Sequence, residues 1–527
     1  MTAATPPPAR TDRLLAALAG ILAGYGGLAV AALVAVVVRP EAGPVPAVGD
    51  AVVDRTPAGV KDWAIRTFGE SDKAVLEFGI LVLLALIAAA LGLLALRRRA
   101  AALGGVGLLG VLGALAAVTR PDSTSAADAL PSLIGAATAA GLLYVLAARL
   151  TRPRRAAAPG TDRRGFLIAG AGVAVGATAA TFLARGLGST RSEHAAASRA
   201  ALRLPRPASP APAVPRGAQL PVEGISPFVT PNRDFYRVDT ALVVPRVDAD
   251  TWRLRVHGSG AARERVFTLP ELMRREVVER DITLACVSNE VGGSLVGNAR
   301  WLGVRLADLL RECGVRPPSQ GGPADQLVAR SVDGMTIGSP VEDVMDGRDA
   351  LLAFGMNGEP LPFAHGFPVR MVVPGLYGYV SACKWLRSLE LTTFAAYDAY
   401  WVPRGWSAQA PVKTQSRIDT PRPFAKLTAG PGRPVAVAGV AWAQHRGIAR
   451  VEVRVDDGPW QDAELGAEDG RDTWRQWVHR WPATPGKHVL TVRATDGTGA
   501  VQTERRADVM PDGATGLHSV EVTVAGD

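Results

Sequence analysis

The chain has 527 residues, too many for a single domain, which predicts about three folded units. Hydrophobic residues make up 48% of the sequence and aromatic residues only 6%, and the apolar excess lies mainly before residue 190, as expected for membrane spans. The formal net charge is +9, but much of the arginine excess lies in short runs at the ends of apolar segments, so the composition does not indicate nucleic-acid binding.

Four apolar segments come first, each close to the roughly 17–25 residues that a transmembrane helix needs. They are Leu14–Val38, Ala74–Leu96, Ala101–Val118 and Leu130–Leu150. Arginines cluster before the first segment, between the second and third, and after the fourth: Arg10, Arg13, Arg97, Arg98, Arg99, Arg149, Arg152, Arg154 and Arg155. By the positive-inside rule these clusters lie in the cytoplasm, which places the N-terminus inside. The spans contain no histidine and no central charge, which favours anchoring over a haem site or ion pathway.

A fifth apolar segment, Thr161–Ala184, begins with Arg163 and Arg164, followed by Phe166 and Leu167. This order resembles a twin-arginine export signal placed inside the chain. An ordinary fifth span with a basic inner flank fits the same residues. Both interpretations place the residues after about 190 outside the cytoplasm. We therefore predict a multi-pass protein of the cell membrane, in contact with lipid, whose second half is extracytoplasmic.

The second half begins with a proline-rich stretch at residues 203–221, which predicts an extended spacer. Strand-like runs then alternate with short helical patterns, which indicates an α+β domain. One such pattern places Leu302, Leu306, Leu309 and Leu310 at helical spacing. After about residue 425 the pattern alternates with period two and contains Asp-Gly turns, as in an immunoglobulin-like β-sandwich.

The predicted organisation is thus multi-domain, with N-terminal transmembrane α-helices, an α+β domain and an Ig-like β-sandwich. The boundaries are a four-helix membrane region at 1–155, the twin-arginine-like segment or fifth transmembrane helix at 156–190, a Pro-rich linker at 191–221, the α+β domain at 222–424 and the sandwich at 425–527.

Cys286 lies in the stretch DITLACVSNEVGG, between a short apolar strand pattern and a turn-rich segment. It is one of three cysteines, which are too few for a disulfide framework. A thiol at the end of a strand can point into a cleft, and a thiolate is a soft ligand for a soft metal. The alternative is a buried free cysteine acting as a small apolar side chain, which is the interpretation we prefer for Cys313 and Cys383.

Four motifs after residue 224 resemble the sulfite oxidase family of molybdopterin-dependent oxidoreductases. They are FYRVDTALVVP at 235–245, LACVSNEVGG at 284–293, NGEPLPFAHGFPVRMVVPGLYGYVSACKWL at 357–386 and GVAWAQHRGIARVEVRVDDGPW at 439–460. The resemblance covers about residues 224–525. It implies a sulfite-oxidase-like molybdopterin domain followed by a dimerisation-type sandwich, and therefore an enzyme that carries a molybdenum–molybdopterin cofactor and forms a homodimer.

The same resemblance implies a site. Cys286 would be the single protein ligand of molybdenum, and Arg237 would face a substrate oxyanion. Tyr236 and Asp239 flank Arg237 near the pterin, and Asn289 steadies the loop that carries the cysteine. The residues that would hold the cofactor are His365, Arg370, Ser381 and Lys384.

The chain departs from the family pattern at two places. Glu290 and Val291 stand where sulfite oxidases have arginines that help bind sulfite, and Arg237-Val238-Asp239 replaces the family's Arg-Asn-His. A carboxylate near the entrance would repel the sulfite dianion. We therefore predict two-electron oxygen-atom transfer on a small polar substrate other than sulfite.

The chain has neither the haem domain of vertebrate relatives nor a Cys-x-x-Cys-His motif, so we expect a separate redox partner, a cytochrome or a quinone-linked protein. Two alternatives stay open. One is a reductase of S- or N-oxides fed by a membrane electron donor, and the other is a non-catalytic surface protein displayed with an Ig-like module.

Overall fold

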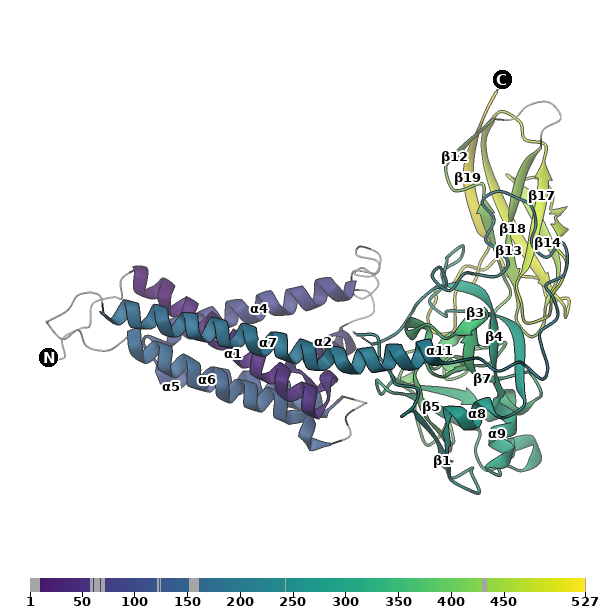
Figure 1. Ribbon diagram of the computed structural model, residues 1–527. Coiled ribbons are helices and arrows are strands. Elements are labelled where there is room, and N and C mark those ends of the chain that lie inside the picture. Colours follow the sequence, from purple (N-terminus) through teal and green to yellow (C-terminus); the bar gives the residue numbers. More distant parts are fainter. Residues whose placement is uncertain are drawn as a thin grey trace. The chain divides into compact units, whose positions relative to one another are not determined.

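The computed structural model describes residues 10–56, 60, 67, 72–120, 123, 125–150, 161–241, 243–428 and 434–526 (Figure 1). The chain forms two compact units. The first contains the residues up to His194 together with Thr240–Val244, and the second contains Ala195–Asp239 and the residues from Pro245 onwards. Three of the predicted cytoplasmic arginines, Arg152, Arg154 and Arg155, lie outside the described residues.

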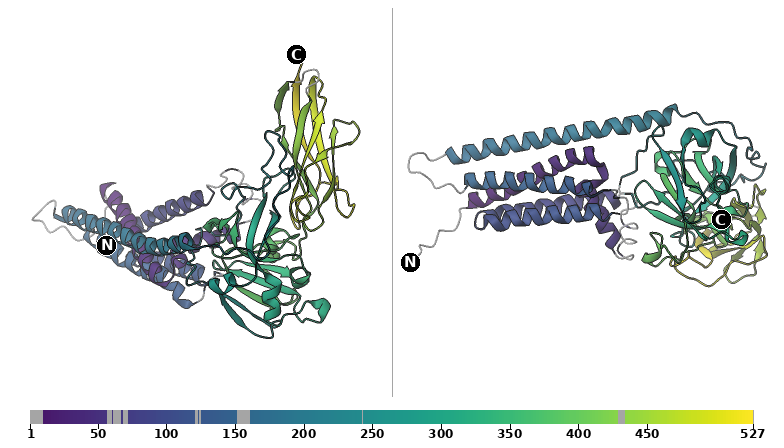
Figure 2. Two further views of the ribbon diagram at one scale, coloured as in Figure 1. Left: turned by 45° about the vertical axis from the view of Figure 1, so that its right-hand side comes forward. Right: turned by 90° about the horizontal axis from the view of Figure 1, so that it is seen from below.

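The first unit is helical (Figure 2). Its helices are α1 (Arg10–Val38), α2 (Pro44–Arg55), α4 (Asp72–Ala95), α5 (Arg99–Val118), α6 (Leu130–Leu150) and α7 (Thr161–Ala201), with short 3₁₀ turns at Pro40–Ala42 and Ala126–Ala129. Five of these helices, all except α2, are long and apolar enough to cross a membrane. They coincide with the five apolar segments of the sequence. Helix α2 lacks a long apolar run, so it was not among the predicted helices.

Glycines let α1 approach two neighbouring helices closely. A methyl group added at Gly20 would collide with the carbonyl oxygen of Ala88 in α4, and one added at Gly92 in α4 would collide with that of Ala16. A methyl group at Gly27 would lie 2.6 Å from the carbonyl oxygen of Gly135 in α6. Such contacts between small residues are how helices associate in lipid, where no hydrophobic effect drives them together.

Two ion pairs join the loops that carry mixed charges. Arg39, directly after α1, lies 2.8 Å from Asp128, and Arg120, directly after α5, pairs with Asp50 in α2. These loops therefore neutralise their own charges. The loop between α4 and α5, with Arg97 and Arg98, carries only positive charge. The orientation of these helices in a membrane stays a prediction.

Helix α7 is longer than the sequence predicts. The apolar segment was expected to end at Ala184 and the linker to begin at residue 191, but the helix continues to Ala201. Residues 185–201 are rich in alanine, and the first proline after position 161 is Pro205, so nothing in this stretch stops a helix. The last turn belongs to the second unit, where the Arg199 side chain donates to the carbonyl oxygens of Leu361 and Pro360 at 2.8 and 2.7 Å.

The second unit begins with an α+β region built on two sheets. One has the strand order β2-β1-β10-β5-β6, and the other has the order β3-β4-β7-β8, with β9 also paired to β7. The strands are β1 (Arg253–Gly258), β2 (Arg265–Thr268), β3 (Val277–Ala285), β4 (Val296–Arg305), β5 (Gln326–Ser331), β6 (Thr336–Pro340), β7 (Leu351–Met356), β8 (Glu359–Pro360), β9 (Arg370–Val372) and β10 (Leu386–Thr392). The short helices are α8 (Leu269–Met273), α9 (Leu306–Glu312), α10 (Val341–Met345) and α11 (Gly378–Ser381).

The predicted leucine helix is correct only in its second half. Leu306, Leu309 and Leu310 lie in α9, but Leu302 lies in β4. The register places Leu302 opposite Glu279 of β3 and Gly355 of β7, so this leucine sits in a central strand. Strand β4 pairs with β3 and β7 and is buried along most of its length. A buried strand is apolar at successive positions, so its leucines can match helical spacing by coincidence.

The C-terminal region is rich in β-structure and also consists of two sheets. Their strand orders are β11-β13-β17-β16 and β12-β19-β18-β14-β15. The strands are β11 (Gln415–Thr420), β12 (Ala425–Thr428), β13 (Val435–Trp442), β14 (Ile448–Val455), β15 (Gln461–Asp462), β16 (Glu464–Leu465), β17 (Arg475–Trp481), β18 (Gly486–Asp496) and β19 (His518–Ala525). Strand β11 pairs with β13, so this region begins before the predicted boundary at residue 425. Its immunoglobulin-type topology stays a prediction.

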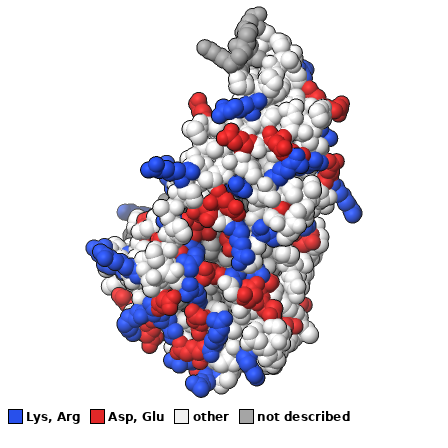
Figure 3. Space-filling view, turned by 90° about the vertical axis from the view of Figure 1, so that its right-hand side faces the viewer, with Lys and Arg blue, Asp and Glu red and all other residues white. Residues whose placement is uncertain are grey.

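Alternation with period two builds the core of this region. In β19 the side chains of Val520, Val522 and Val524 are buried while the residues between them are exposed. Acidic and basic side chains are interspersed over the face of the molecule seen in Figure 3. The positive net charge is therefore not gathered into one basic patch on that face.

We predict that His518 makes the protein sensitive to acid. Burial, and secondarily the Arg417 cation, lower the pKa of His518 to about 4, whereas an unfolded histidine titrates near about 6.5. The contribution to stability is therefore complete above about pH 6.5 and is lost as the pH falls, about 2 kcal/mol of it by pH 5 and about 3 kcal/mol by pH 4. In His518→Asn, which keeps an acceptor for the Ile418 N–H, the drop in thermal midpoint between pH 7 and pH 5 should be smaller. Tryptophan fluorescence measures this, and an unchanged drop would contradict it.

Candidate active site

Cys286 directly follows β3, at the strand end where the sequence places it. Its N–H donates to the carbonyl oxygen of Leu295 at 2.9 Å, and its carbonyl oxygen accepts from the N–H of Asn289 at 3.1 Å. The side-chain oxygen of Asn289 accepts from the N–H of Leu295 at 2.7 Å. Asn289 therefore closes the loop that carries the thiol. Burial raises the pKa of the Cys286 thiol, while hydrogen bonds from Ser288 and the charge of Lys384 oppose that rise.

Tyr236 lies beside the end of β3. Its ring stacks on Phe235 with 5.2 Å between centroids. A methyl group added at Gly378 would lie 3.6 Å from both the Tyr236 hydroxyl and the carbonyl oxygen of Ala285. Burial, followed by the proximity of Cys286, raises the pKa of the Tyr236 phenol. The phenol is thus a neutral hydrogen-bonding group next to the thiol.

Arg370 carries a buried charge. Its guanidinium donates to the carbonyl oxygens of His365 and Ala382, at 3.2 and 3.5 Å, and lies 4.9 Å from the centre of the Trp301 ring. Burial lowers the pKa of Arg370 to about 10, so the group stays charged at neutral pH. Its Nε atom is buried and has no hydrogen-bond partner, and no carboxylate lies within 4.0 Å among the described residues.

His365 lies next to Arg370 and is neutral. Its Nε2 atom is 2.9 Å from the carbonyl oxygen of Asn232, and its ring meets Phe235 edge-on at 5.6 Å. Burial, and secondarily the charge of Arg370, lower the pKa of His365 to about 4. This histidine can therefore offer a neutral hydrogen-bonding group but no second positive charge.

Asp239 connects two cations. Its Oδ2 atom lies 2.9 Å from Lys384 Nζ and 2.8 Å from Arg237 Nε. The carboxylate and the ammonium are nearly buried, with side-chain exposures of 2% and 11%, whereas Arg237 is 38% exposed. Burial lowers the pKa of Lys384 to about 8, against the opposing effect of Asp239. Arg237 therefore forms the solvent-facing end of the cluster.

Gly366 lies close to the two cations that the sequence predicts to hold a cofactor, Arg370 and Lys384. It has a φ of +106°, and a Cβ added there would lie 3.1 Å from the Cβ atoms of both Arg370 and Lys384. Ser381 is fully buried, and its hydroxyl is 3.0 Å from the carbonyl oxygens of both Leu376 and Tyr377. The hydroxyl thus already has local partners, and its contact with a cofactor stays a prediction.

The predicted residues lie in one region of the second unit. Electrostatic coupling links Cys286 to Tyr236 and Lys384, and links Arg370 to Tyr236, His365 and Lys384. Sequence reasoning did not find Trp301, whose ring faces the Arg370 guanidinium, or Asp333. Burial and the neighbouring Asp239 raise the pKa of the Asp333 carboxyl. No motif marks either residue, because their roles come from tertiary packing.

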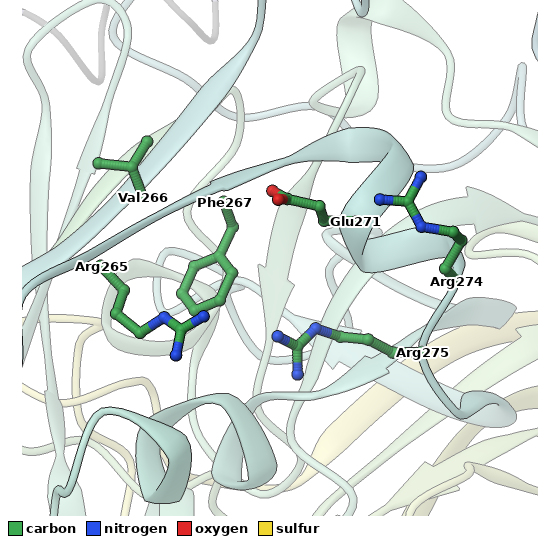
Figure 4. A pocket seen from close by; sticks show the side chains of 6 residues that line it. All are labelled: Arg265, Val266, Phe267, Glu271, Arg274 and Arg275. Atoms are coloured by element: carbon green, nitrogen blue, oxygen red, sulfur yellow. The ribbon is translucent and has the colours of Figure 1, made fainter.

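A separate surface pocket lies over β2 and α8 (Figure 4). Its lining residues are Arg265, Val266, Phe267, Glu271, Arg274 and Arg275. None of them is a predicted site residue. Arg265 and Arg275 both pair with Glu312, at 2.9 and 2.7 Å, so much of the positive charge here is already compensated.

Comparison with known proteins gives the family. Residues 241–401 match the oxidoreductase molybdopterin binding domain. Sulfite oxidase of Gallus gallus is 30% identical over 344 residues, which cover 56% of this chain and 72% of that protein. The chain belongs to the sulfite oxidase family. Mitochondrial sulfite oxidase of Homo sapiens is 30% identical over 325 residues, 54% of this chain and 58% of that protein. Nitrate reductase [NADH] 1 of Oryza sativa subsp. japonica is 34% identical over 197 residues, 33% of this chain and 21% of that protein.

The chain thus spans less than two thirds of the length of the human relative. The matched residues 241–401 lie in the second unit except for 241–244, which belong to the first. The chain is a molybdopterin-binding oxidoreductase that uses the molybdenum cofactor. Cys286, Asn289, His365, Arg370, Ser381 and Lys384 lie inside the matched domain, and Tyr236, Arg237 and Asp239 directly precede it.

The buried residues fit this cofactor. A buried guanidinium without a carboxylate partner is unfavourable unless an anion compensates it. The pterin phosphate is such an anion, and Arg370, with its orphaned Nε, would bind it together with Lys384 and His365. Among the described residues no group of three or more His, Cys, Asp or Glu side chains could hold a metal ion, and the role of Cys286 as the ligand of molybdenum stays a prediction.

We expect Arg370→Met to separate cofactor binding from folding. Without cofactor, the free energy of unfolding of the variant should be at least that of the unsubstituted protein. It should exceed it by up to about 1–4 kcal/mol, because an uncompensated buried charge is removed. With cofactor supplied, its molybdenum content should fall sharply. Metal analysis and thermal unfolding of both forms measure this.

Arg305→Met is the matched control, because Arg305 pairs with Asp349 and Glu276 at 2.8 and 2.9 Å. It should lose stability without losing molybdenum. A destabilised Arg370→Met protein with a full complement of metal would contradict the assignment of Arg370.

Proposed function

We propose that the protein is a membrane-anchored, extracytoplasmic oxidoreductase that transfers an oxygen atom to or from a small polar substrate. The observation that carries this proposal is the buried cationic group of Arg370 and Lys384 beside the Cys286 thiol. When bound, the molybdenum cofactor supplies two-electron oxygen-atom transfer. Because the chain spans only part of its human relative, its overall activity is inferred from the site.

Different side chains of the site bind the metal, the cofactor and the substrate. Cys286 is the protein ligand of the metal, on a loop closed by Asn289. The cofactor is held by His365, Arg370, Ser381 and Lys384, with Tyr236 and Asp239 beside the pterin. Arg237, the exposed member of the cluster, orients an anionic or polar substrate. Its partner Asp239 fixes the direction of the guanidinium.

Five apolar helices support a membrane anchor. The arginine clusters support a cytoplasmic N-terminus and an extracytoplasmic second unit. Electrons then have to pass to a separate redox partner, a cytochrome or a quinone-linked protein. The twin-arginine-like residues at the start of α7 support export of the folded second unit, and the C-terminal β-rich region supports an Ig-like dimerisation role.

Sulfite is a poor candidate substrate. Glu290 follows the loop asparagine, is exposed, and stands where the family's arginine helps bind the dianion. Its carboxylate lowers the local concentration of an anion through long-range repulsion. A substrate with less negative charge avoids this repulsion.

A second candidate is a reductase of an S- or N-oxide. The similarity to a nitrate reductase favours it, since that relative's name describes reduction of an N-oxide anion. The same residues would serve in this direction, with electrons arriving from a membrane donor. Assays with sulfite, nitrate and sulfoxides, using artificial electron carriers, separate the two directions.

Loss of the thiolate should remove the metal. The unsubstituted protein should contain about one molybdenum per chain, and Cys286→Ser should lose most of it, because an alcohol is a poor ligand for a soft metal. Cys313→Ser is the control, since Cys313 is a buried cysteine at the end of α9. Metal analysis checks both. A metal-free unsubstituted protein that is stably folded would end the enzymatic proposal.

Reversing the charge of Glu290 should improve the use of sulfite. In Glu290→Arg we expect KM for sulfite to fall by about tenfold at low salt, and less at high salt, because the site is exposed and screened. Glu290→Gln should give a smaller fall. Rapid sulfite oxidation by the unsubstituted protein, unaffected by either substitution, is the outcome that excludes this role of Glu290.

A further inference from the structure

Strand β3, which ends before Cys286, is an edge strand of its sheet, and residues 208–209 bond its outer side at Val277 and Glu279, at the end away from the thiol. The C-terminal region covers that side at Thr283. The N–H of Thr283 donates to the carbonyl oxygen of Asp472 at 2.9 Å, and its carbonyl oxygen accepts from Gln444 Nε2 at 2.9 Å. Its hydroxyl accepts from the N–H of Trp474 at 2.8 Å. The C-terminal region thus satisfies the open edge just before the thiol.

The far side of the Cys286 loop is held by the same region. Arg417 of β11 has a side chain that is 10% exposed, and its Nη1 atom donates to the carbonyl oxygen of Gly293 at 2.8 Å. Its other nitrogens are fixed by Asp419 at 2.6 Å and by the Ser226 hydroxyl at 2.9 Å. Arg417 therefore has little freedom to move away from the loop.

Gly293 transmits this contact towards Cys286. Its N–H donates to the carbonyl oxygen of Glu290 at 2.8 Å, and a Cβ added there would lie 2.6 Å from the Asn289 side-chain oxygen. Asn289 in turn holds the N–H of Leu295, whose carbonyl oxygen accepts from Cys286. The path from Arg417 to the backbone of Cys286 is thus a series of hydrogen bonds and close contacts.

His518 of β19 supports the neighbouring residue. Gly292 has a φ of +80°, and a side chain there would collide with the His518 ring. The ring is held by the N–H of Ile418, which donates to its Nδ1 atom at 3.0 Å. Arg417 and His518 thus come from two strands, one in each C-terminal sheet, and reach adjacent glycines of one loop.

We propose that Arg417 is a positioning residue, which holds the Cys286 loop so that the thiol is presented to the metal, and that the C-terminal region thereby sets the geometry of the metal ligand. The inference rests on the proposed role of Cys286. Arg417 touches neither Arg370 nor Lys384, so its loss leaves the cofactor clamp intact and loosens the ligand loop alone.

Cysteine alkylation in the cofactor-free full chain tests the loop directly. The probe is a maleimide, and mass spectrometry of the peptides gives the rate at each of the three cysteines, all buried. In Arg417→Met we expect the alkylation rate at Cys286 to rise about tenfold. The loop can then open locally without first breaking the hydrogen bond from residue 417 to Gly293, so opening costs less free energy. The rates at Cys313 and Cys383 should not change. Arg417→Lys keeps the charge and one donor, so its alkylation rate at Cys286 should lie between those of the unsubstituted protein and Arg417→Met.

Arg446→Met is the matched control. Arg446 lies in the same region and pairs with Asp496 at 2.9 Å, but its other hydrogen bonds go to Val412 and Thr414 rather than to the loop. It should leave the Cys286 rate unchanged. If Arg417→Met unfolds, all three cysteines become reactive, and His518→Ala then provides the second test, with the same rise expected at Cys286.

In the cofactor-loaded protein the same variant should keep its molybdenum but change the electron paramagnetic resonance signal of the metal after partial reduction with dithionite. An unchanged Cys286 rate in folded Arg417→Met and His518→Ala proteins overturns the inference. Absence of molybdenum from the unsubstituted protein would instead overturn the proposed function, and the alkylation result would still stand by itself.

Discussion

The second unit depends on a positive charge that the protein buries without neutralising. Arg370 is held by two carbonyl oxygens and the Trp301 ring, and no carboxylate accompanies it among the described residues. Such a group destabilises the empty fold and strongly favours the bound state of an anion. Binding of the pterin phosphate would compensate this buried charge and so recover the cost of burying it. Cofactor binding would therefore be coupled to folding.

The protonation of Lys384 also depends on whether an anion is bound. Burial lowers the pKa of Lys384 to about 8 in the cofactor-free state, so part of the population is neutral near physiological pH. An anion beside it favours the ammonium form and raises this pKa. Asp239 moderates the change, since its carboxylate already faces Lys384 at 2.9 Å and Arg237 at 2.8 Å. Asp239 thus lies between the buried ammonium of Lys384 and the more exposed guanidinium of Arg237.

The sequence was most informative where chemistry and local pattern coincide. The five apolar helices, the position of Cys286 at a strand end and the period-two strands of the C-terminal region could all be predicted, because each depends on local periodicity. Leu302 was misplaced because strand pairing overrides helical spacing, and the extension of α7 to Ala201 was missed because the expected linker has no helix stop before Pro205. Arg417 and Trp301 could not be found, since only tertiary packing brings them to the site.

The contacts at Thr283 and Gly293 also change how the C-terminal region is understood. A module added only for dimerisation would need one exposed face and no link to the metal ligand. Here the region covers the edge of β3 at Thr283 and holds the turn after Cys286 at Gly293. It therefore helps to fix the position of Cys286. Changes in sheet packing as far away as β19 therefore act on the position of one sulfur atom. A thiolate fixed from both sides loses little entropy on binding metal, which is the physical advantage of building the loop between two regions.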